Sequence, residues 1–285
     1  MKITLITACY NSAPTIRTAI ESVISQRGVD VEHIVIDGGS SDGTVEIIKE
    51  YSTRSTRSTR LKYISERDRG MYDAINKGVK MATGDIIGIL NADDVLATDE
   101  TLAHIASAFE SPEVGSPKSE VDCIYADIRF VKRRDVASPS RIGGPSNMDT
   151  LESLRAASTV RYCSARRWRP WMFRFAAMVP HPSFYVRREC FDRLGGYSLD
   201  YRICADFELE LRYLYLAKLR AAYLPECVVV MRMGGASTAG WRSNVEINRE
   251  DLRALRAHGV WSCLPLIYLK YLFKIWGFVF RRGAW

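Results

Sequence analysis

Two neighbouring acids, Asp93 and Asp94, follow an apolar run at Ile86–Leu90. Adjacent carboxylates at the end of a buried strand repel each other and are costly to desolvate unless a cation joins them. Mg²⁺ or Mn²⁺ takes oxygen ligands and is often shared between one or two carboxylates and the phosphates of a substrate. The pair therefore favours a metal–phosphate site, and the alternative is an exposed acidic turn that caps the next helix.

A second segment whose residues could bind a ligand is the run 37–44, which reads Asp-Gly-Gly-Ser-Ser-Asp-Gly-Thr. Glycines let a backbone approach a ligand closely, and Asp37 could accept a hydrogen bond from the N–H of a base. The alternative is a tight turn before a helix. A dinucleotide fold would need GxGxxG after the first strand, where residues 8–12 read Ala-Cys-Tyr-Asn-Ser, so the sequence disfavours NAD or FAD.

The elements that must position these residues are strands alternating with helices. Short β-favouring apolar runs occur at 3–7, 31–36, 61–65, 86–90 and 121–126, and helical periodicity separates them at 16–24, 71–79 and 100–109. Such units predict an α/β fold with a mostly parallel twisted sheet flanked by helices. Ligands of such sheets bind beyond the carboxyl ends of the strands, so we expect segments 8–11, 37–44, 66–76 and 91–94 to form one site.

Composition narrows the class of protein. The 285 residues are 47% hydrophobic and carry a net charge of +7, which indicates a folded chain with an anionic partner. Seven scattered cysteines without a CxxC pair predict reduced thiols rather than disulfides or a cysteine zinc site. Asn11 and Pro14 interrupt the first apolar run too early for a signal peptide, so we expect a cytoplasmic protein. Three Ser-Thr-Arg repeats at 52–60 predict a solvated loop.

Four motifs together carry a family resemblance. Residues 7–11 (Thr-Ala-Cys-Tyr-Asn), 37–44, 65–78 and 91–94 (Asn-Ala-Asp-Asp) resemble family 2 glycosyltransferases of the GT-A fold, in particular bacterial members that build surface polysaccharides. The resemblance implies a GT-A-like domain over 1–240, with a nucleotide-binding half at 1–127 and an acceptor half at 128–240. Residues 241–285 would then form a helical, amphipathic C-terminal tail.

The resemblance also implies a donor site for a nucleotide-sugar. Asp37 would face the base, Arg69 or Lys77 the diphosphate and Asn76 the sugar, although Lys77 could instead form an i,i+4 ion pair with Asp73. Asp93 matches the acid that binds Mg²⁺ or Mn²⁺ in the family. The implied donor-binding residues are Thr7, Tyr10, Asn11, Asp37, Asp68, Arg69, Asn76, Lys77, Asn91, Ala92, Asp93 and Asp94, and Asn91 departs from the family's usual aspartate.

On the acceptor side, Asp206 matches the family's catalytic base, and its alternative role is a helix N-cap. Glu208 is the second candidate for the base. His181 matches a histidine near the acceptor site and could equally be structural. Residues 232–237 resemble a segment that closes over the donor diphosphate.

Two segments indicate where the enzyme works. Residues 161–178 interleave arginines with aromatics, which suits single-stranded nucleic acid, a lipid headgroup interface or a structural cover over the sheet. The apolar run Leu264–Phe280 contains Lys270 and Lys274, whose charges could reach water from a helix lying in a membrane interface. We favour such an anchor over an oligomer interface or a membrane span.

The sequence as a whole predicts an inverting, metal-dependent glycosyltransferase on the inner face of the cell membrane. It would move a sugar from a nucleotide-sugar, with UDP-sugars favoured, to a hydroxyl of a glycan or lipid-linked acceptor in polysaccharide biosynthesis, without a nucleic-acid partner. A nucleotidyltransferase is disfavoured because it would need a glycine-rich basic loop after the first strand. The alternative of another class is a catalytically silent binder of nucleotide-sugar or RNA. No motif encodes the sugar, the acceptor, the linkage or the oligomeric state.

Overall fold

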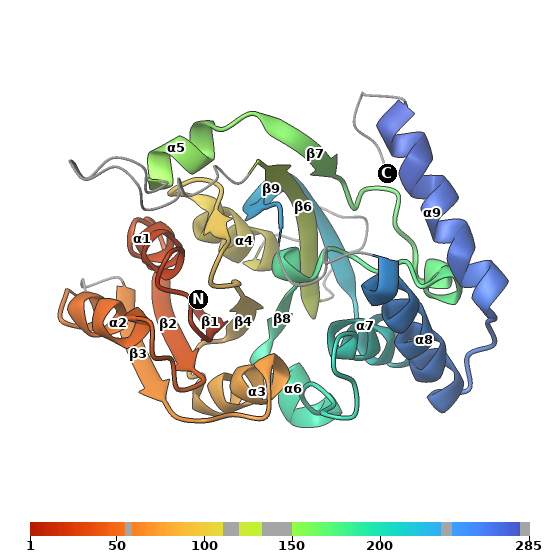
Figure 1. The fold of residues 1–285 in the computed structure, drawn as a ribbon, viewed down its shortest axis with the longest axis horizontal. Coiled ribbons are helices and arrows are strands. Elements are labelled where there is room, and N and C mark those ends of the chain that lie inside the picture. The colour runs from red at the N-terminus through yellow and green to blue at the C-terminus, as the bar shows by residue number, and fades with distance from the viewer. Residues whose placement is uncertain (55–58, 111–119, 133–149, 235–240, 280–285) are drawn as a thin grey trace.

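The computed structural model describes residues 1–54, 59–110, 120–132, 150–234 and 241–279 (Figure 1). All five expected strands are present: β1 (Lys2–Cys9), β2 (Asp30–Asp37), β3 (Thr59–Ser65), β4 (Ile86–Ile89) and β6 (Cys123–Val131). The apolar runs of β1, β2, β4 and β6 are buried, as expected for strands covered on both faces, whereas β3 at the edge of the sheet is only partly buried. Part of the Ser-Thr-Arg repeat, 55–58, lies outside the described residues, as do 235–237 of the segment expected to close over the donor.

The described strands form one nine-stranded sheet with the order β3-β2-β1-β4-β8-β6-β9-β5, and β7 (Thr159–Cys163) pairs with β6. Strands β1 to β4 are parallel to one another. Strand β8 (Tyr185–Arg187) lies antiparallel between β4 and β6, and β5 (Val95–Leu96) pairs antiparallel with β9 (Ala221–Arg232). The α/β class and the GT-A-like sheet are therefore confirmed, with an antiparallel strand at its centre that the sequence did not predict.

Helices cover both faces of this sheet (Figure 1). One face carries α3 (Met71–Met81), α6 (Arg188–Leu194) and α7 (Ala205–Glu210), and the other carries α1 (Ile16–Ile24), α2 (Thr44–Ser52) and α4 (Thr101–Glu110). Close packing requires glycine at two positions. A Cβ at position 78 in α3 would lie 2.5 Å from Ile6, and a Cβ at position 88 in β4 would lie 2.3 Å from the ring of Tyr185. The short helix α5 (Leu151–Ala156) precedes β7.

The C-terminal segment is helical, with α8 (Trp241–Ala257) and α9 (Leu264–Val279) beside the short helix η1 (Pro170–Phe175) and the π-helical turn η3 (Leu211–Leu216). Lys270 does not reach toward solvent as expected for an interfacial lysine. Its side chain is only 7% exposed and forms a 2.8 Å ion pair with Asp251 of α8. The side chain of Lys274 lies outside the described residues. Among the helices described, none is long and apolar enough to cross a membrane.

Candidate active site

The carboxyl ends of β1, β2 and β3 stand level, because Cys9 pairs with Asp37 and Asp37 pairs with Ser65 in the strand register. The carboxylate of Asp37 is buried and accepts hydrogen bonds from the N–H groups of Gly39 and Ser40 and from the hydroxyl of Ser65. Burial opposes ionisation, but these hydrogen bonds lower the pKa of Asp37 below its usual range. In this structure Asp37 therefore orders the glycine loop rather than presenting a free acceptor to a base.

The loop after β1 is tied to the same glycine-rich segment. The side-chain oxygen of Asn11 accepts a hydrogen bond from the backbone N–H of Ser41 at 3.0 Å. The backbone N–H of Asn11 donates to Ser40 Oγ at 2.7 Å. Tyr10 is 65% exposed at this edge. Thr7 is fully buried and shares a 3.0 Å hydrogen bond with the ring of His33, so its side chain is part of the core, and its expected place in the donor site stays a prediction.

The side chain of Asp68 packs closely against the backbone of the glycine-rich loop. A Cβ at Gly38 would lie 2.7 Å from Asp68 Oδ2, and Asp68 Oδ1 accepts a hydrogen bond from Gly70 N–H at 2.8 Å. Glycine at position 38 leaves room for this carboxylate beside the end of β2, and a methyl group there would require the Asp68 side chain to move. Asp68 thus lies at the strand ends, next to the start of α3.

Three predicted donor residues of the α3 region have partners within the protein. Lys77 pairs with Glu66 at 2.7 Å and more distantly with Asp73 at 3.9 Å, while Arg69 pairs with Asp73 at 3.4 Å. The amide of Asn76 donates to the carbonyl and accepts from the N–H of Tyr197, at 2.8 and 2.9 Å. In this structure the side chain of Asn76 joins α3 to the backbone of Tyr197, and its expected place beside the sugar stays a prediction.

The acidic loop after β4 lies beside β1, since Leu90 N–H donates to Ile6 C=O at 3.0 Å. Asp94 is buried and accepts a 2.8 Å hydrogen bond from the side chain of Asn91 on Oδ2. Burial, followed by the nearby charge of Asp93, raises the pKa of Asp94 well above its ordinary value. Asp93 is half-buried and Ala92 is buried behind it.

Arg232, at the end of β9, supports this acidic loop. Its guanidinium donates to the backbone carbonyl of Asp93 and to Thr18 Oγ1, the latter at 2.8 Å, and its charge acts on Asp94. The arginine is buried. From the sequence, residues 232–237 were expected to close over the donor diphosphate. The positive charge of Arg232 at the start of that segment was the one signal that it could support the acidic loop.

The acidic loop has the donor set of a shared metal site. Within the described residues there is no group of three or more His, Cys, Asp or Glu side chains that could hold a metal. Mg²⁺ and Mn²⁺ need no such cage where substrate phosphates complete the coordination. Asp93 supplies one half-buried carboxylate, and Asp94 Oδ1 beside it is buried with no hydrogen-bond partner in the described structure. These residues therefore fit a cation that the donor would bring with it.

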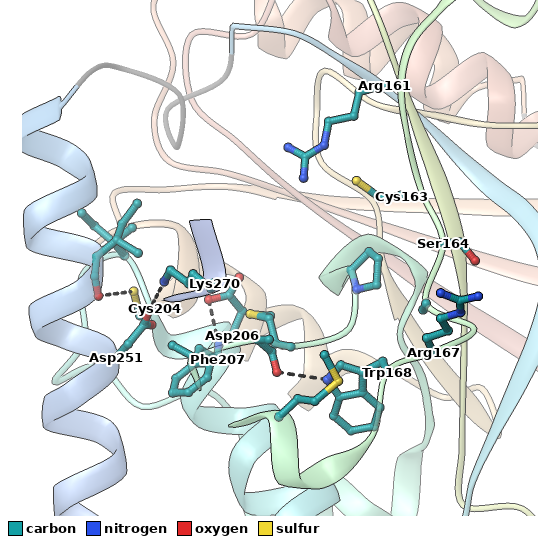
Figure 2. A pocket seen from close by; sticks show the side chains of 18 residues that line it. Arg161, Cys163, Ser164, Arg167, Trp168, Cys204, Asp206, Phe207, Asp251 and Lys270 are labelled. Carbon is teal, nitrogen blue, oxygen red and sulfur yellow. Dashed lines mark hydrogen bonds and ion pairs between the residues drawn. The ribbon is translucent and has the colours of Figure 1, made fainter. Parts of the chain in front are cut away.

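A cavity of about 360 Å³ opens on the acceptor side, between η1, α7, α8 and α9 (Figure 2). Asp206, in the first turn of α7, lies on its wall. The N-cap of α7 is Cys204, so the alternative that Asp206 merely caps the helix is wrong. Residues 161–178 form part of this wall, which agrees with a structural role for the segment.

The carboxylate of Asp206 lies beside the hydroxyl of Tyr72 of α3. That hydroxyl donates to the backbone carbonyl of Ile203 at 2.5 Å and also lies within hydrogen-bond distance of Asp206 Oδ1, at 3.2 Å, while Phe207 N–H donates to Asp206 Oδ1 at 2.8 Å. The Tyr72 ring is buried and stacks on Tyr197 with centroids 5.6 Å apart. Burial raises the pKa of Tyr72, so its hydroxyl stays protonated and serves as a donor. The contact between Tyr72 and Asp206 was not predicted from the sequence.

The two other acceptor-side candidates are held by the protein. Both oxygens of Glu208 are bound by Arg212, at 2.6 and 3.0 Å, and Oε1 also contacts His258 at 2.8 Å. Its role as second candidate base stays a prediction, and in this structure its carboxylate is paired with Arg212. His181 Nε2 shares a 2.8 Å hydrogen bond with the Tyr197 hydroxyl. Burial lowers the pKa of His181, although the charge of Asp206 acts in the opposite direction, so the imidazole is neutral at pH 7.

The sheet, the acid-lined strand ends and the separate cavity beside an aspartate define a glycosyltransferase of the GT-A type. The model described as Glycosyl transferase family 2 matches residues 4–173, more than half of the chain. The chain belongs to this family. It is 27% identical over 251 residues to a PGL/p-HBAD biosynthesis glycosyltransferase of Mycobacterium bovis, covering 88% of this chain and 82% of that relative.

Solved structures share the fold. TarS of S. aureus superposes with a TM-score of 0.59 at 17% identity over 90% of this chain, but this chain spans only 40% of TarS. A shorter TarS fragment has been solved with UDP and with UDP-GlcNAc. The mannosyltransferase PcManGT from Pyrobaculum calidifontis, solved with GDP-Man and Mn²⁺, has a TM-score of 0.55 at 18% identity, covering 97% of this chain and 80% of that one.

Proposed function

We propose that this glycosyltransferase is a metal-dependent, inverting enzyme that moves a sugar from a UDP-sugar to a hydroxyl of a glycan or lipid-linked acceptor in polysaccharide biosynthesis. The observation that carries the proposal is the position of Asp206. Its carboxylate lies on the wall of the acceptor cavity and is held by Tyr72, whose helix α3 begins beside Asp68 at the donor edge. Helix α3 thus lies between the proposed donor-binding residues and the proposed base.

The chemistry follows from these contacts. The acceptor hydroxyl gives its proton to Asp206, its oxygen forms a bond to the anomeric carbon, and the bond from that carbon to the donor phosphate breaks. Because attack and departure occur on opposite sides, the configuration inverts. Tyr72 and the Phe207 N–H hold Asp206 through Oδ1 and so fix the direction of the carboxylate. The neutral His181 lies near enough for the charge of Asp206 to act on it.

On the donor side, Asp93 is proposed to hold Mg²⁺ or Mn²⁺ together with the donor diphosphate. Such a cation, when bound, offsets negative charge on the departing nucleoside diphosphate. Arg232 holds the backbone carbonyl of Asp93 and so keeps the acidic loop in place. The Mn²⁺ in the PcManGT structure supports a metal in this fold. The TarS complexes with UDP and UDP-GlcNAc support a UDP-sugar as donor, whereas PcManGT was solved with GDP-Man. Tyr10, Asn11 and Asp68 are proposed to line the nucleoside pocket.

The decisive experiment compares Asp206→Asn with wild type. We expect sugar transfer to fall by about 10²- to 10⁴-fold, the usual contribution of a general base, while UDP affinity in the presence of Mn²⁺ stays within about twofold. Asp200→Asn, at an acid of the preceding loop, is the matched control. Full transfer by Asp206→Asn would overturn the assignment of the base.

The rival readings predict different results in the same assay. A silent nucleotide-sugar binder would bind UDP without any turnover in wild type. A nucleotidyltransferase would release pyrophosphate rather than UDP. An RNA binder would show salt-sensitive RNA affinity that ignores UDP.

Peripheral association with the inner face of the cell membrane is also proposed. Trp261 is 71% exposed, and Tyr268 and Leu269 on α9 are 41% and 39% exposed, so aromatic and apolar side chains meet solvent on this side. A triple change to serine at these positions should reduce sedimentation with anionic vesicles and leave UDP binding unchanged. If it instead converts a dimer to a monomer without affecting vesicle binding, the surface is an oligomer interface.

A further inference from the structure

The acceptor cavity is mainly apolar around Asp206. Trp168 and Phe207 line it (Figure 2), and so do Met172 of η1, Met178 and Ile247 of α8. Trp168 and Phe207 are buried behind the cavity surface, while Met172 and Ile247 are half-buried. A volume of about 360 Å³ falls within the range of pockets that enclose small organic ligands.

Several polar groups of the wall are already bound to protein partners. Lys270 Nζ contacts Asp251 at 2.8 Å, Trp168 Nε1 donates to Ala177 C=O at 3.0 Å, and Cys204 Sγ donates to a backbone carbonyl of α8 at 3.5 Å. A sugar placed wholly in this cavity would lose hydrogen bonds to water without replacing them at these positions, which costs free energy. Arg161 lies at the end of the cavity away from Phe207 (Figure 2).

We propose that this cavity binds an apolar aglycone of the acceptor, aromatic or alkyl, and thereby presents the acceptor hydroxyl to Asp206. The inference rests on the proposed function, because it assigns Asp206 as the base, and it adds the chemical class that the acceptor must contain. Burial of an apolar group against Trp168, Met172 and Ile247 supplies the binding free energy, since these side chains exclude water without requiring hydrogen bonds.

The C-terminal helices determine this specificity directly. Ile247 and Asp251 of α8 and Lys270 of α9 all line the cavity. The buried Lys270–Asp251 pair holds α9 against α8, so the wall depends on both helices being in place. The segment expected from the sequence to be a membrane tail thus forms part of the acceptor site.

The test uses methyl, hexyl and phenyl glucosides as probes, with calorimetric titration of the full chain. For wild type we expect the hexyl and phenyl compounds to bind at least about tenfold more tightly than the methyl compound, because the aglycone transfers apolar area from water. Ile247→Trp and Met172→Trp fill the cavity from opposite walls and should each abolish that difference. Leu216→Trp, at a residue 41% exposed outside the cavity lining, is the matched control and should retain it.

The outcomes separate this inference from the proposed function. Equal binding of the three glucosides by wild type, or a preserved preference in both filled variants, overturns the apolar site. UDP binding and the melting temperature of each variant are measured in parallel, so that loss through misfolding is recognised. If the aglycone preference and its loss on filling are observed but wild type transfers no sugar from any UDP-sugar, the proposed function fails while the apolar site stands.

Discussion

Replacing Lys270 by methionine tests how the C-terminal helices are held. Lys270 and Asp251 are 7% and 3% exposed and form one ion pair at 2.8 Å. Breaking a buried pair by removing one partner leaves an uncompensated charge and typically costs about 3–5 kcal/mol. Burial already raises the pKa of Asp251, and the Lys270 charge lowers it, so the substitution should raise it further.

Protonation of Asp251 sets an upper limit to the stability that is lost when Lys270 is removed. The unpaired carboxyl can take up a proton, which at pH 7 costs about 4 kcal/mol relative to an unfolded state with the ordinary pKa of 3.8. At pH 5 the same cost is only about 2 kcal/mol. A raised folded-state pKa means that the unfolded state binds fewer protons, so the variant loses stability as the pH rises. We expect a loss of about 3 kcal/mol at pH 7 and a smaller loss at pH 5.

The assay is urea denaturation of wild type, Lys270→Met and the double variant Lys270→Met/Asp251→Leu at both pH values. The double variant should recover most of the lost stability, because a buried pair replaced by apolar groups is often neutral. A single variant that loses less than about 1 kcal/mol, or loses the same amount at pH 5 and pH 7, would refute the reasoning. So would a double variant as unstable as the single one.

Three further predictions address the sheet and the base. Burial opposes ionisation of Glu32, but hydrogen bonds lower its pKa to about 2. The ionised carboxylate therefore adds about 3 kcal/mol to the free energy of unfolding above pH 4.5, and this contribution is lost as the pH falls toward 2. Glu32→Gln should flatten that part of the denaturation profile, and an unchanged acid limb would contradict this. Gly88→Ala places a methyl group 2.3 Å from the Tyr185 ring and should cost about 1–3 kcal/mol in thermal unfolding, whereas an unchanged melting temperature would show that the ring yields freely. Tyr72→Phe should lower kcat about tenfold without changing UDP affinity, because it removes the hydroxyl that orients Asp206; unchanged kcat would exclude that positioning role.

Local patterns in the sequence were sufficient to predict five of the nine described strands and the polar segments that follow them. A run such as Ile86–Leu90 is buried because its side chains are apolar on both faces, whatever its neighbours. The rule that parallel strands end at one edge then placed Asp37 and Asp93 together, and the register confirms that edge for Asp37. The domain boundaries at 127 and 240 stay predictions.

What only the tertiary structure decided is which polar groups are already occupied. Asn76 binds the backbone of Tyr197, 121 positions away, and Lys270 is neutralised by Asp251 rather than by water. Residue type and spacing cannot reveal such partners, because the cost of burying a polar group depends on atoms brought near it by distant parts of the chain. The sequence therefore predicted where the site lies and which chemistry it contains. The packed fold determined which side chains, such as Asp206, remain on a cavity wall, where we propose that they carry out that chemistry.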